Sequence, residues 1–191
     1  MIIDYPNWFK HKSEDYFTQH LQNFKDKNNL KFLQIGVFTG DGSLWLVDNL
    51  LTGQGCTLTD VDRWELDASA TQASHDWFAD VEATYDAKTE GYSNIIKYKM
   101  DSTTFFAQNS DSFDFIYLDG DKSADGVYAD AMAAWQTLKP NGLFVRDDLT
   151  LCDLDENWDP APGIAAFLSA INGQYEVVNQ TEQHLLIKKT A

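Results

Sequence analysis

The sequence predicts an α/β fold, a Rossmann-like doubly wound sheet of seven strands that ends in an antiparallel hairpin. Two observations lead to this prediction. Short apolar runs rich in branched and aromatic residues alternate with longer segments of helical spacing, as in parallel sheets buried on both faces. The first apolar run is also followed by a glycine-rich loop and an apolar helix, the usual opening of a nucleotide-binding sheet.

The composition is that of a single globular domain with an acidic surface. The 191 residues are 43% hydrophobic, and 30 acidic against 14 basic residues give a net charge of −16. This charge opposes binding to nucleic acid or to an anionic membrane, so we expect a small molecule or a metal as ligand. Cys56 and Cys152 lack metal-ligand spacing, and neither a secretory signal nor a membrane-spanning run is present. We therefore expect a soluble, cytoplasmic protein.

Residues 1–30 are expected to form a helical extension packed on a domain of residues 31–191. A helix is predicted to begin at Ser13, a residue type that caps helices, and to end near Asn28. Its apolar residues, which fall on one face, are Tyr16, Phe17, Leu21 and Phe24.

The first β-α unit contains the glycine loop. Residues 31–35 are predicted to form a buried strand, residues 36–43 the loop, and residues 44–51 a helix. The loop glycines, Gly36, Gly40 and Gly42, depart from the spacing of dinucleotide-binding loops, and no phosphate-binding lysine follows them. A nucleoside without phosphates is the ligand that such a loop favours.

The second and third units follow the same alternation. Residues 57–62 are predicted to form a strand whose tip, Asp62, is placed to bind a ribose, whereas Asp60 lies inside the strand. A helix is predicted over residues 68–85, with Trp77 on its inner face. A third strand is predicted over residues 94–98.

The central stretch predicts a right-handed parallel crossover. Residues 113–118 and 143–146 are predicted strands, residues 125–138 are the crossover helix, and a turn is expected at Pro140 to Gly142. Beyond it, we predict a helix over residues 164–171 and a hairpin of residues 175–178 and 184–188.

This topology brings four carboxylates to one edge of the sheet. Asp119 and Asp121 follow the first of the two strands, and Asp147 and Asp148 follow the second. Ligands of open α/β sheets bind outside the carboxyl ends of the strands, so we expect the chemistry at this edge. Trp158, in the acidic loop that follows, is a candidate wall of the site.

Several stretches resemble, in order, the motifs of class I S-adenosylmethionine-dependent methyltransferases. The resemblance is closest to the small-molecule O-methyltransferase-like group, which has an aspartate-glycine-aspartate strand end and later paired aspartates. It covers about residues 31 to 189. The stretches are LQIGVFTGDGSLWLVDNLL, TLTDVDRW, KMDS, FDFIYLDGDKSADGVYADAMAAWQTLKPNGLFVRDD and PGIAAFL.

The resemblance implies a role for each motif residue. The glycine loop would line the methionine part of S-adenosylmethionine, Asp62 would hold the ribose, and Asp101 would lie beside the adenine. In the metal-dependent sugar and macrolide O-methyltransferases of this group, the counterparts of Asp119, Asp147 and Asp148 bind a divalent cation, Mg²⁺ or Mn²⁺. The counterpart of Asp121 acts as the base. The cofactor-binding residues implied are Gly36, Val37, Gly40, Ser43, Asp62, Arg63, Asp101, Ser102 and Asp119.

Three residues depart from the family pattern. Gln34 stands where an acid is usual, Lys122 where a histidine follows the second aspartate, and Arg146 directly precedes the paired aspartates. A lysine or arginine beside the carboxylates would stabilise their charges much as a metal does. An ion-paired set of aspartates without a metal is therefore the alternative to a metal site.

The expected function is methyl transfer from S-adenosylmethionine to a hydroxyl of a small molecule, with a sugar or glycoside among the candidates. One alternative is a metal-dependent glycosyltransferase, because Asp119-Gly120-Asp121 also resembles a D-x-D signature. Another is a non-catalytic S-adenosylmethionine-binding module, suggested by Lys122 and Arg146. The sequence names neither the acceptor nor the oligomeric state, and it allows a homodimer.

Overall fold

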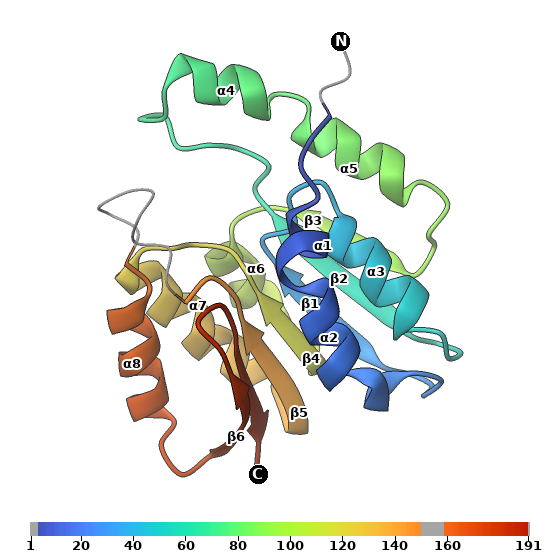
Figure 1. Ribbon diagram of the computed structural model, residues 1–191, viewed down its shortest axis with the longest axis vertical. Coiled ribbons are helices and arrows are strands. Elements are labelled where there is room, and N and C mark those ends of the chain that lie inside the picture. The colour runs from blue at the N-terminus through green and yellow to red at the C-terminus, as the bar shows by residue number, and fades with distance from the viewer. Residues whose placement is uncertain (1–3, 150–158, 191) are drawn as a thin grey trace.

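A computed structural model describes residues 4–149 and 159–190, and within them seven strands form one sheet (Figure 1). The strand order is β3-β2-β1-β4-β5-β7-β6, in which the first five strands are parallel and β7 runs antiparallel to both β5 and β6. This confirms the predicted fold class. The bounds are β1 Lys31–Ile35, β2 Thr57–Asp62, β3 Ile95–Lys99, β4 Phe113–Leu118, β5 Leu138–Arg146, β6 Tyr175–Gln180 and β7 Leu185–Lys189.

Helices cover both faces of this sheet (Figure 1). One face packs against the first three helices and the other against the last three, so the sheet is the middle of three layers. The helices are α1 Trp8–Lys12, α2 Glu14–His20, α3 Asp41–Asn49, α4 Gln72–Phe78, α5 Val81–Thr89, α6 Ser102–Gln108, α7 Ala124–Thr137 and α8 Ala161–Ala170, with a 3₁₀ turn, η1, at Gln22–Phe24.

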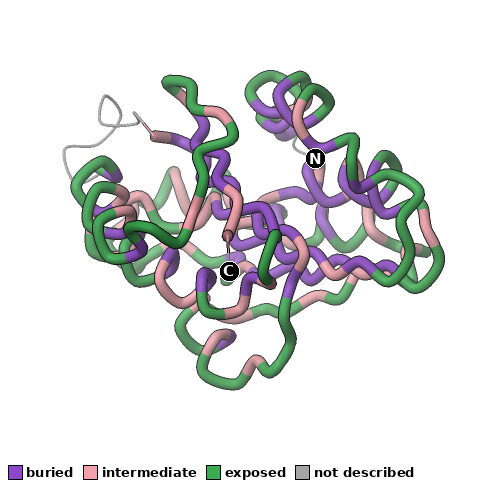
Figure 2. The backbone as a smooth tube through the Cα atoms, turned by 90° about the horizontal axis from the view of Figure 1, so that it is seen from below, coloured by how far each residue is buried: buried purple, intermediate pink, exposed green. Residues whose placement is uncertain are grey.

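Alternation along the strands divides the core between the two faces. In β1, Phe32 joins the cluster under α1 to α3, whereas Leu33 and Ile35 join the cluster under α6 to α8. In β4, Phe115 and Ile116 divide in the same way. Figure 2 shows the result, with the buried segments gathered in the interior and the exposed segments around them. The apolar strand runs in the sequence therefore mark strands covered on both faces.

The point where the strand order reverses lies between β1 and β4. β1 pairs with both β2 and β4, and the chain leaves it through the glycine loop. This is the position at which doubly wound sheets bind ligands. No helix in residues 4–149 and 159–190 is long and apolar enough to cross a membrane.

The helix predicted over residues 68–85 is two helices. α4 begins after Thr71, whose hydroxyl accepts a hydrogen bond from the Ser74 backbone, and it ends at Phe78 before α5 begins at Val81. Trp77 is 38% exposed rather than part of the core, so its predicted inward position is wrong.

Two other boundaries differ from the prediction. The N-terminal segment is α1, α2 and η1 instead of one helix, with Ser13 at the junction of α1 and α2. β5 begins at Leu138, so the turn expected at Pro140 to Gly142 lies within it. The pairing of β4 with β5 shifts register there, and Asn141 has a φ of +64°, so the turn signal marks an irregularity in the strand.

Candidate functional site

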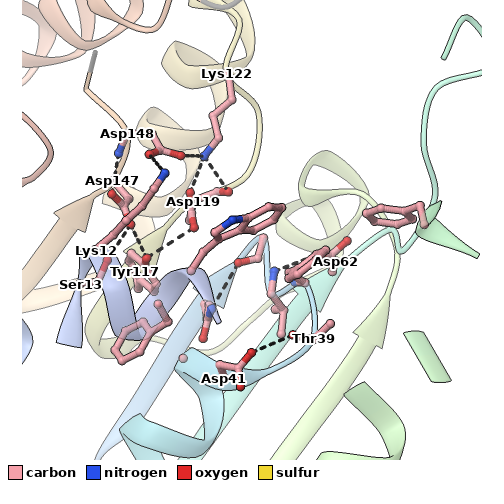
Figure 3. Close-up of a pocket in the computed structure, with 18 residues that line it drawn as sticks. Lys12, Ser13, Thr39, Asp41, Asp62, Tyr117, Asp119, Lys122, Asp147 and Asp148 are labelled. Atoms are coloured by element: carbon pink, nitrogen blue, oxygen red, sulfur yellow. Dashed lines mark hydrogen bonds and ion pairs between the residues drawn. The ribbon is translucent and has the colours of Figure 1, made fainter. Parts of the chain in front are cut away.

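A pocket of about 480 Å³ lies at the carboxyl ends of β1, β4 and β5 (Figure 3). The glycine loop forms one side, the N-terminal segment covers it, and the ends of β4 and β5 close the far side. Its lining residues are Trp8, Phe9, Lys12, Ser13, Gln34, Gly36, Val37, Phe38, Thr39, Asp41, Gly42, Asp62, Phe78, Tyr117, Asp119, Lys122, Asp147 and Asp148.

The glycine loop is shaped by its close approach to β4. Gly36 has a φ of +80°, and a Cβ at this position would collide with the carbonyl group of Asp119. Gly40, at the start of α3, has a φ of +81° and lies against the ring of Tyr85. Both positions therefore require glycine, and the loop backbone lies open to the pocket.

Asp62 fastens this loop to the end of β2. One carboxylate oxygen accepts hydrogen bonds from the backbone N–H groups of Val37 and Phe38, at 2.7 and 3.1 Å, and the other accepts one from Trp64 at 2.8 Å. The carboxylate also lines the pocket. Asp62 is thus placed both to hold the loop and to accept further hydrogen bonds from a ligand.

A buried polar network lies beneath the loop. Gln34 donates to the carbonyl of Gly36 at 3.3 Å and accepts from the hydroxyl of Ser43 at 3.3 Å. Tyr85 donates to Oδ2 of Asp60 at 2.9 Å, while Oδ1 of Asp60 has no hydrogen-bond partner among the described residues. Complete burial raises the pKa of Asp60 to about 7, against the opposing effect of its hydrogen bonds.

Asp119, Asp147 and Asp148 come together at the far end of the pocket, and we call these three the acidic rim (Figure 3). The carboxylate of Asp147 is buried and saturated with donors. These are Tyr117 Oη at 2.5 Å, Ser13 Oγ at 3.0 Å, Gln183 Nε2 at 2.6 Å, the Asp148 backbone N–H at 2.7 Å and, when protonated, His184 Nε2 at 3.3 Å. Although burial opposes its charge, these contacts hold the pKa of Asp147 well below its usual value.

Two lysines neutralise the rest of the acidic rim. The ammonium of Lys122 donates to the carbonyl of Asp119 at 3.0 Å and forms ion pairs with the carboxylates of Asp119 and, at 3.0 Å, Asp148. Lys12 pairs with the other oxygen of Asp148 at 3.1 Å. Burial raises the pKa of Asp119 to about 6, and the charge of Lys122 acts in the opposite direction.

The acidic rim does not fit a divalent cation. A metal needs free carboxylate oxygens, but both oxygens of Asp147 are filled by donors and both oxygens of Asp148 pair with lysines. Oδ1 of Asp119 pairs with Lys122, and its Oδ2 lies 3.4 Å from the hydroxyl of Tyr117. Among the described residues, no three His, Cys, Asp or Glu side chains form a group that could hold a metal ion. The ammonium of Lys122 occupies the space between carboxylates in which a metal would sit.

Arg146 plays a different part from the one its sequence position suggests. Its guanidinium is buried and donates to the backbone carbonyls of Leu118 and Asp121, at 2.9 and 3.0 Å. It fixes the loop between β4 and α7 and forms no ion pair with Asp147. Of the two cations that sequence analysis singles out, Lys122 pairs with the acidic rim and Arg146 does not.

Asp121 lies outside the pocket. Its side chain is exposed and folds over the first turn of α7, where it accepts a hydrogen bond from the Ser123 backbone at 2.7 Å and packs against Gly126. Its role as the base stays a prediction, without support from this geometry.

Three of the implied cofactor-binding residues, Asp101 and Ser102 beside the adenine and Arg63, also lie outside the pocket lining. Asp101 caps α6 through the Thr104 backbone at 2.7 Å, Ser102 donates to Asp130 at 2.5 Å, and Arg63 pairs with Asp67 at 3.0 Å. Trp158, the predicted wall, falls outside the described residues. The adenine contacts remain predictions.

Sequence reasoning misses the part of the site that comes from the N-terminal segment. Trp8, Phe9, Lys12 and Ser13 all line the pocket. The sequence indicates only a helix cap at Ser13, and no motif spacing links these residues to the acidic rim far along the chain. The spacing of Trp8 and Lys12, one helical turn apart, is the available signal that both face the same way.

Comparison with known proteins gives the family and the fold. A family model described as a methyltransferase domain matches residues 33–149, and no curated protein matches the chain by sequence. The crystal structure of a putative rRNA-methylase from Clostridium thermocellum is 12% identical, with a TM-score of 0.68 over 99% of each chain.

Two further solved structures contain ligands. MycE, a methyltransferase from the mycinamycin biosynthetic pathway in complex with Mg and SAH, is 15% identical with a TM-score of 0.64, and the match covers 98% of this chain and 51% of MycE. The O-methyltransferase from Bacillus cereus in complex with SAH is 15% identical with a TM-score of 0.61, and the match covers 93% of this chain and 80% of that one. At these identities the similarity establishes the fold.

Proposed function

The chain belongs to the methyltransferase domain family, whose model matches residues 33–149, and from this membership we propose that it transfers a methyl group from S-adenosylmethionine to a hydroxyl of a small molecule. The observation that carries the proposal is the pocket itself, in which an open glycine loop held by Asp62 faces the end of β4. Both lie at the switch point of the sheet, the usual ligand position in this architecture.

The loop has the features that a nucleoside-bearing cofactor requires. The backbone at Gly36 packs so closely on Asp119 that no side chain fits between them, and Gly36 itself lines the pocket where the methionine part would lie. Asp62 presents a carboxylate for ribose hydroxyls. When S-adenosylmethionine is bound, its sulfonium supplies an activated methyl group. The chain's own task is then to orient the acceptor oxygen and to accept its proton.

The described geometry supports Asp119, and not Asp121, as the group that accepts this proton. Asp119 lines the pocket and adjoins the glycine loop, whereas Asp121 is exposed on the first turn of α7. A D-x-D site needs both of its aspartates on one ligand, but Asp119 lines the pocket and Asp121 does not. The glycosyltransferase alternative therefore loses its support. A metal is left out of the proposal because Lys122 and Lys12 already neutralise the acidic rim.

A small-molecule acceptor fits the size and charge of the protein. The pocket is covered by the N-terminal segment, and the net charge of −16 opposes the approach of a polyanion such as RNA. A cytoplasmic location and a homodimer stay predictions.

Calorimetric titration with S-adenosylmethionine and SAH, each with and without Mg²⁺, tests the proposal. We expect both to bind with affinities independent of Mg²⁺. SAH should also form when hydroxyl-bearing acceptors are added, and Asp119→Asn should reduce turnover by ~10²–10⁴-fold while Asp121→Asn stays near wild type. Absence of binding would refute the proposal, and tight binding without turnover against a broad acceptor panel would favour the non-catalytic binding module.

A further inference from the structure

Three of the five aromatic residues that line the pocket contact one another through Phe38, and we call these three, Trp8, Phe38 and Phe78, the aromatic wall. The ring of Trp8 stacks on Phe38 with centroids 4.6 Å apart and an interplanar angle of 27°. Phe38 in turn stacks on Trp77 at 5.8 Å. Despite these contacts Trp8 remains 46% exposed, so much of its indole is open to the pocket and solvent. An exposed aromatic surface at the mouth of a pocket is typical of a ligand-binding wall.

The aromatic wall is held in a fixed conformation. Phe38 has a φ of +54°, which is unfavourable for a bulky residue, and its carbonyl accepts a hydrogen bond of 2.8 Å from the indole of Trp64. Tyr5 contacts Phe38 and Trp77 edge-on, at 5.6 and 5.2 Å. Backbone strain that the surroundings maintain is most often found at binding sites.

The acidic rim lines the same pocket as this wall but offers no Lewis acid. All three N–H groups of the Lys122 ammonium are used by Asp119 and Asp148. An aliphatic hydroxyl has a pKa of about 16, close to that of water, and metal ions normally lower such values. A phenol has a pKa of about 10, as in tyrosine, so it can be deprotonated without a metal.

Among residues 4–149 and 159–190, the ammonium of Lys12 forms one ion pair, with Asp148 at 3.1 Å. Within this part of the chain, that pair uses one of the three N–H groups and leaves the other two for a ligand in the pocket. Trp8 and Lys12 are four residues apart on α1 and both line the pocket, so they share one helix face. A ring against Trp8 therefore places its substituent one helical turn along, at the ammonium of Lys12, which stabilises a developing oxyanion.

From these observations, and resting on the proposed function, we propose that the acceptor hydroxyl is phenolic. The acceptor ring lies against the aromatic wall, and its oxygen lies between Lys12 and Asp119. The phenolic proton passes to the Asp119 carboxylate, and the oxygen forms the new C–O bond as the C–S bond of the cofactor breaks, with the electron pair remaining on sulfur. A sugar suits this pocket less well, because the wall would leave several of its hydroxyls without hydrogen-bond partners.

A matched pair of probes tests this inference. 2-Naphthol and decahydro-2-naphthol have similar shapes, but only the first is aromatic and acidic. Calorimetry with the SAH-loaded protein in the presence of EDTA should show 2-naphthol binding at least tenfold more tightly. Methyl transfer from S-adenosylmethionine should occur to 2-naphthol alone. Equal or reversed affinities, or transfer to the saturated alcohol or to a glycoside instead, would overturn the inference and leave the proposed function standing.

Variants separate the contribution of the acceptor's ring to binding from the contribution of its oxygen to catalysis. Trp8→Ala should weaken 2-naphthol binding about tenfold or more and leave the Kd of SAH unchanged, and Trp8→Phe should restore most of the loss. Lys12→Met should lower kcat and move the pH profile of kcat upward, whereas Lys12→Arg should keep the wild-type profile. Lys10→Met, on the exposed face of α1, is the matched control and should change neither.

Unchanged 2-naphthol affinity in Trp8→Ala, or an unshifted profile in Lys12→Met, would refute the corresponding assignment. Failure of S-adenosylmethionine and SAH to bind at all would instead refute the proposed function, and the two failures are therefore distinguishable.

Discussion

Ser13 donates a hydrogen bond of 3.0 Å to Asp147, a residue 134 positions further along the chain. The same hydroxyl lies 3.0 Å from Nε2 of His184. Through these contacts the junction of α1 and α2 is fastened to the end of β5 and the start of β7, and the N-terminal segment is held over the pocket.

Replacing this hydroxyl should loosen the N-terminal segment. Ser13→Ala leaves two buried polar groups short of a partner, so we expect the free energy of unfolding to fall by about 1–3 kcal/mol. Urea denaturation measures the loss, with the exposed Ser110→Ala as control. A stability indistinguishable from that of the control would show that the bond contributes nothing.

Lys122 should substitute for a metal in stabilising the acidic rim. Lys122→Ala leaves the carboxylates of Asp119 and Asp148 facing each other, which we expect to destabilise the fold by about 3 kcal/mol, at the lower end for a broken buried pair because Asp119 is partly exposed. The variant should gain Mg²⁺ binding, and Mg²⁺ should raise its Tm, while EDTA and Mg²⁺ leave the wild-type Tm unchanged.

The control for this experiment is Lys139→Ala, which breaks the pair with Asp114 at 2.7 Å on the surface. Its Tm should not respond to Mg²⁺. A wild-type protein whose Tm rises with Mg²⁺ would contradict the role of Lys122 as a substitute for the metal.

Asp62 should matter more for cofactor affinity than Asp101. Asp62→Ala removes charge-assisted hydrogen bonds to the ribose, each worth ~1.5–3 kcal/mol, and also releases the Val37 and Phe38 backbone. Asp101→Ala removes the cap of α6 and should lower stability by about 1 kcal/mol with little change in affinity. Calorimetry with SAH and thermal melts separate the two effects. A larger loss of affinity in the Asp101 variant would show that the nucleoside lies elsewhere.

Asp60 should make the protein less stable as the pH rises. Its pKa is about 7 in the folded protein and near 3.8 when unfolded, so between these values the folded state binds more protons. The contribution of Asp60 to the free energy of unfolding is therefore fully present below about pH 4 and is lost as the pH rises to about 7. Asp60→Asn fixes the neutral form, and its advantage over wild type should grow from near zero at pH 4 to roughly 2–4 kcal/mol at pH 8.

Urea melts of wild type, Asp60→Asn and the exposed control Asp125→Asn across this range measure the difference. Wild-type and Asp60→Asn curves that run parallel with pH would exclude a buried proton on Asp60.

Local patterns in the sequence are sufficient for the presence and order of the strands and for the edge of the sheet at which the pocket lies. The short length of the apolar runs and their high apolar content identify β1, β2 and β4, because each strand is buried on both faces. The crossover rule then brings Asp119, Asp147 and Asp148 to one edge. The rule does not hold for Asp121, because its side chain lies over the first turn of α7, where it accepts a hydrogen bond from the Ser123 backbone, and not at the pocket.

The remainder depends on contacts between distant parts of the chain. Trp8 and Lys12 lie over the pocket because Ser13 holds the N-terminal segment to Asp147 and His184, and no local pattern encodes those contacts. The prediction for Trp77 is wrong because helical periodicity extends across residues 79 and 80, where the chain breaks the helix.

The hydrogen bond between Ser13 and His184 also sets the earliest time during biosynthesis at which the pocket can be complete. The two residues are 171 positions apart, and ribosomes add roughly 5–20 residues per second, so α1 waits about ten to thirty seconds for its partner strand to be made. During that time Tyr16 and Phe17 of α2 lack the ring of His184, which both of them contact in the folded protein. A growing chain can form the glycine loop early, but the covered pocket arises only as one of the last events of folding.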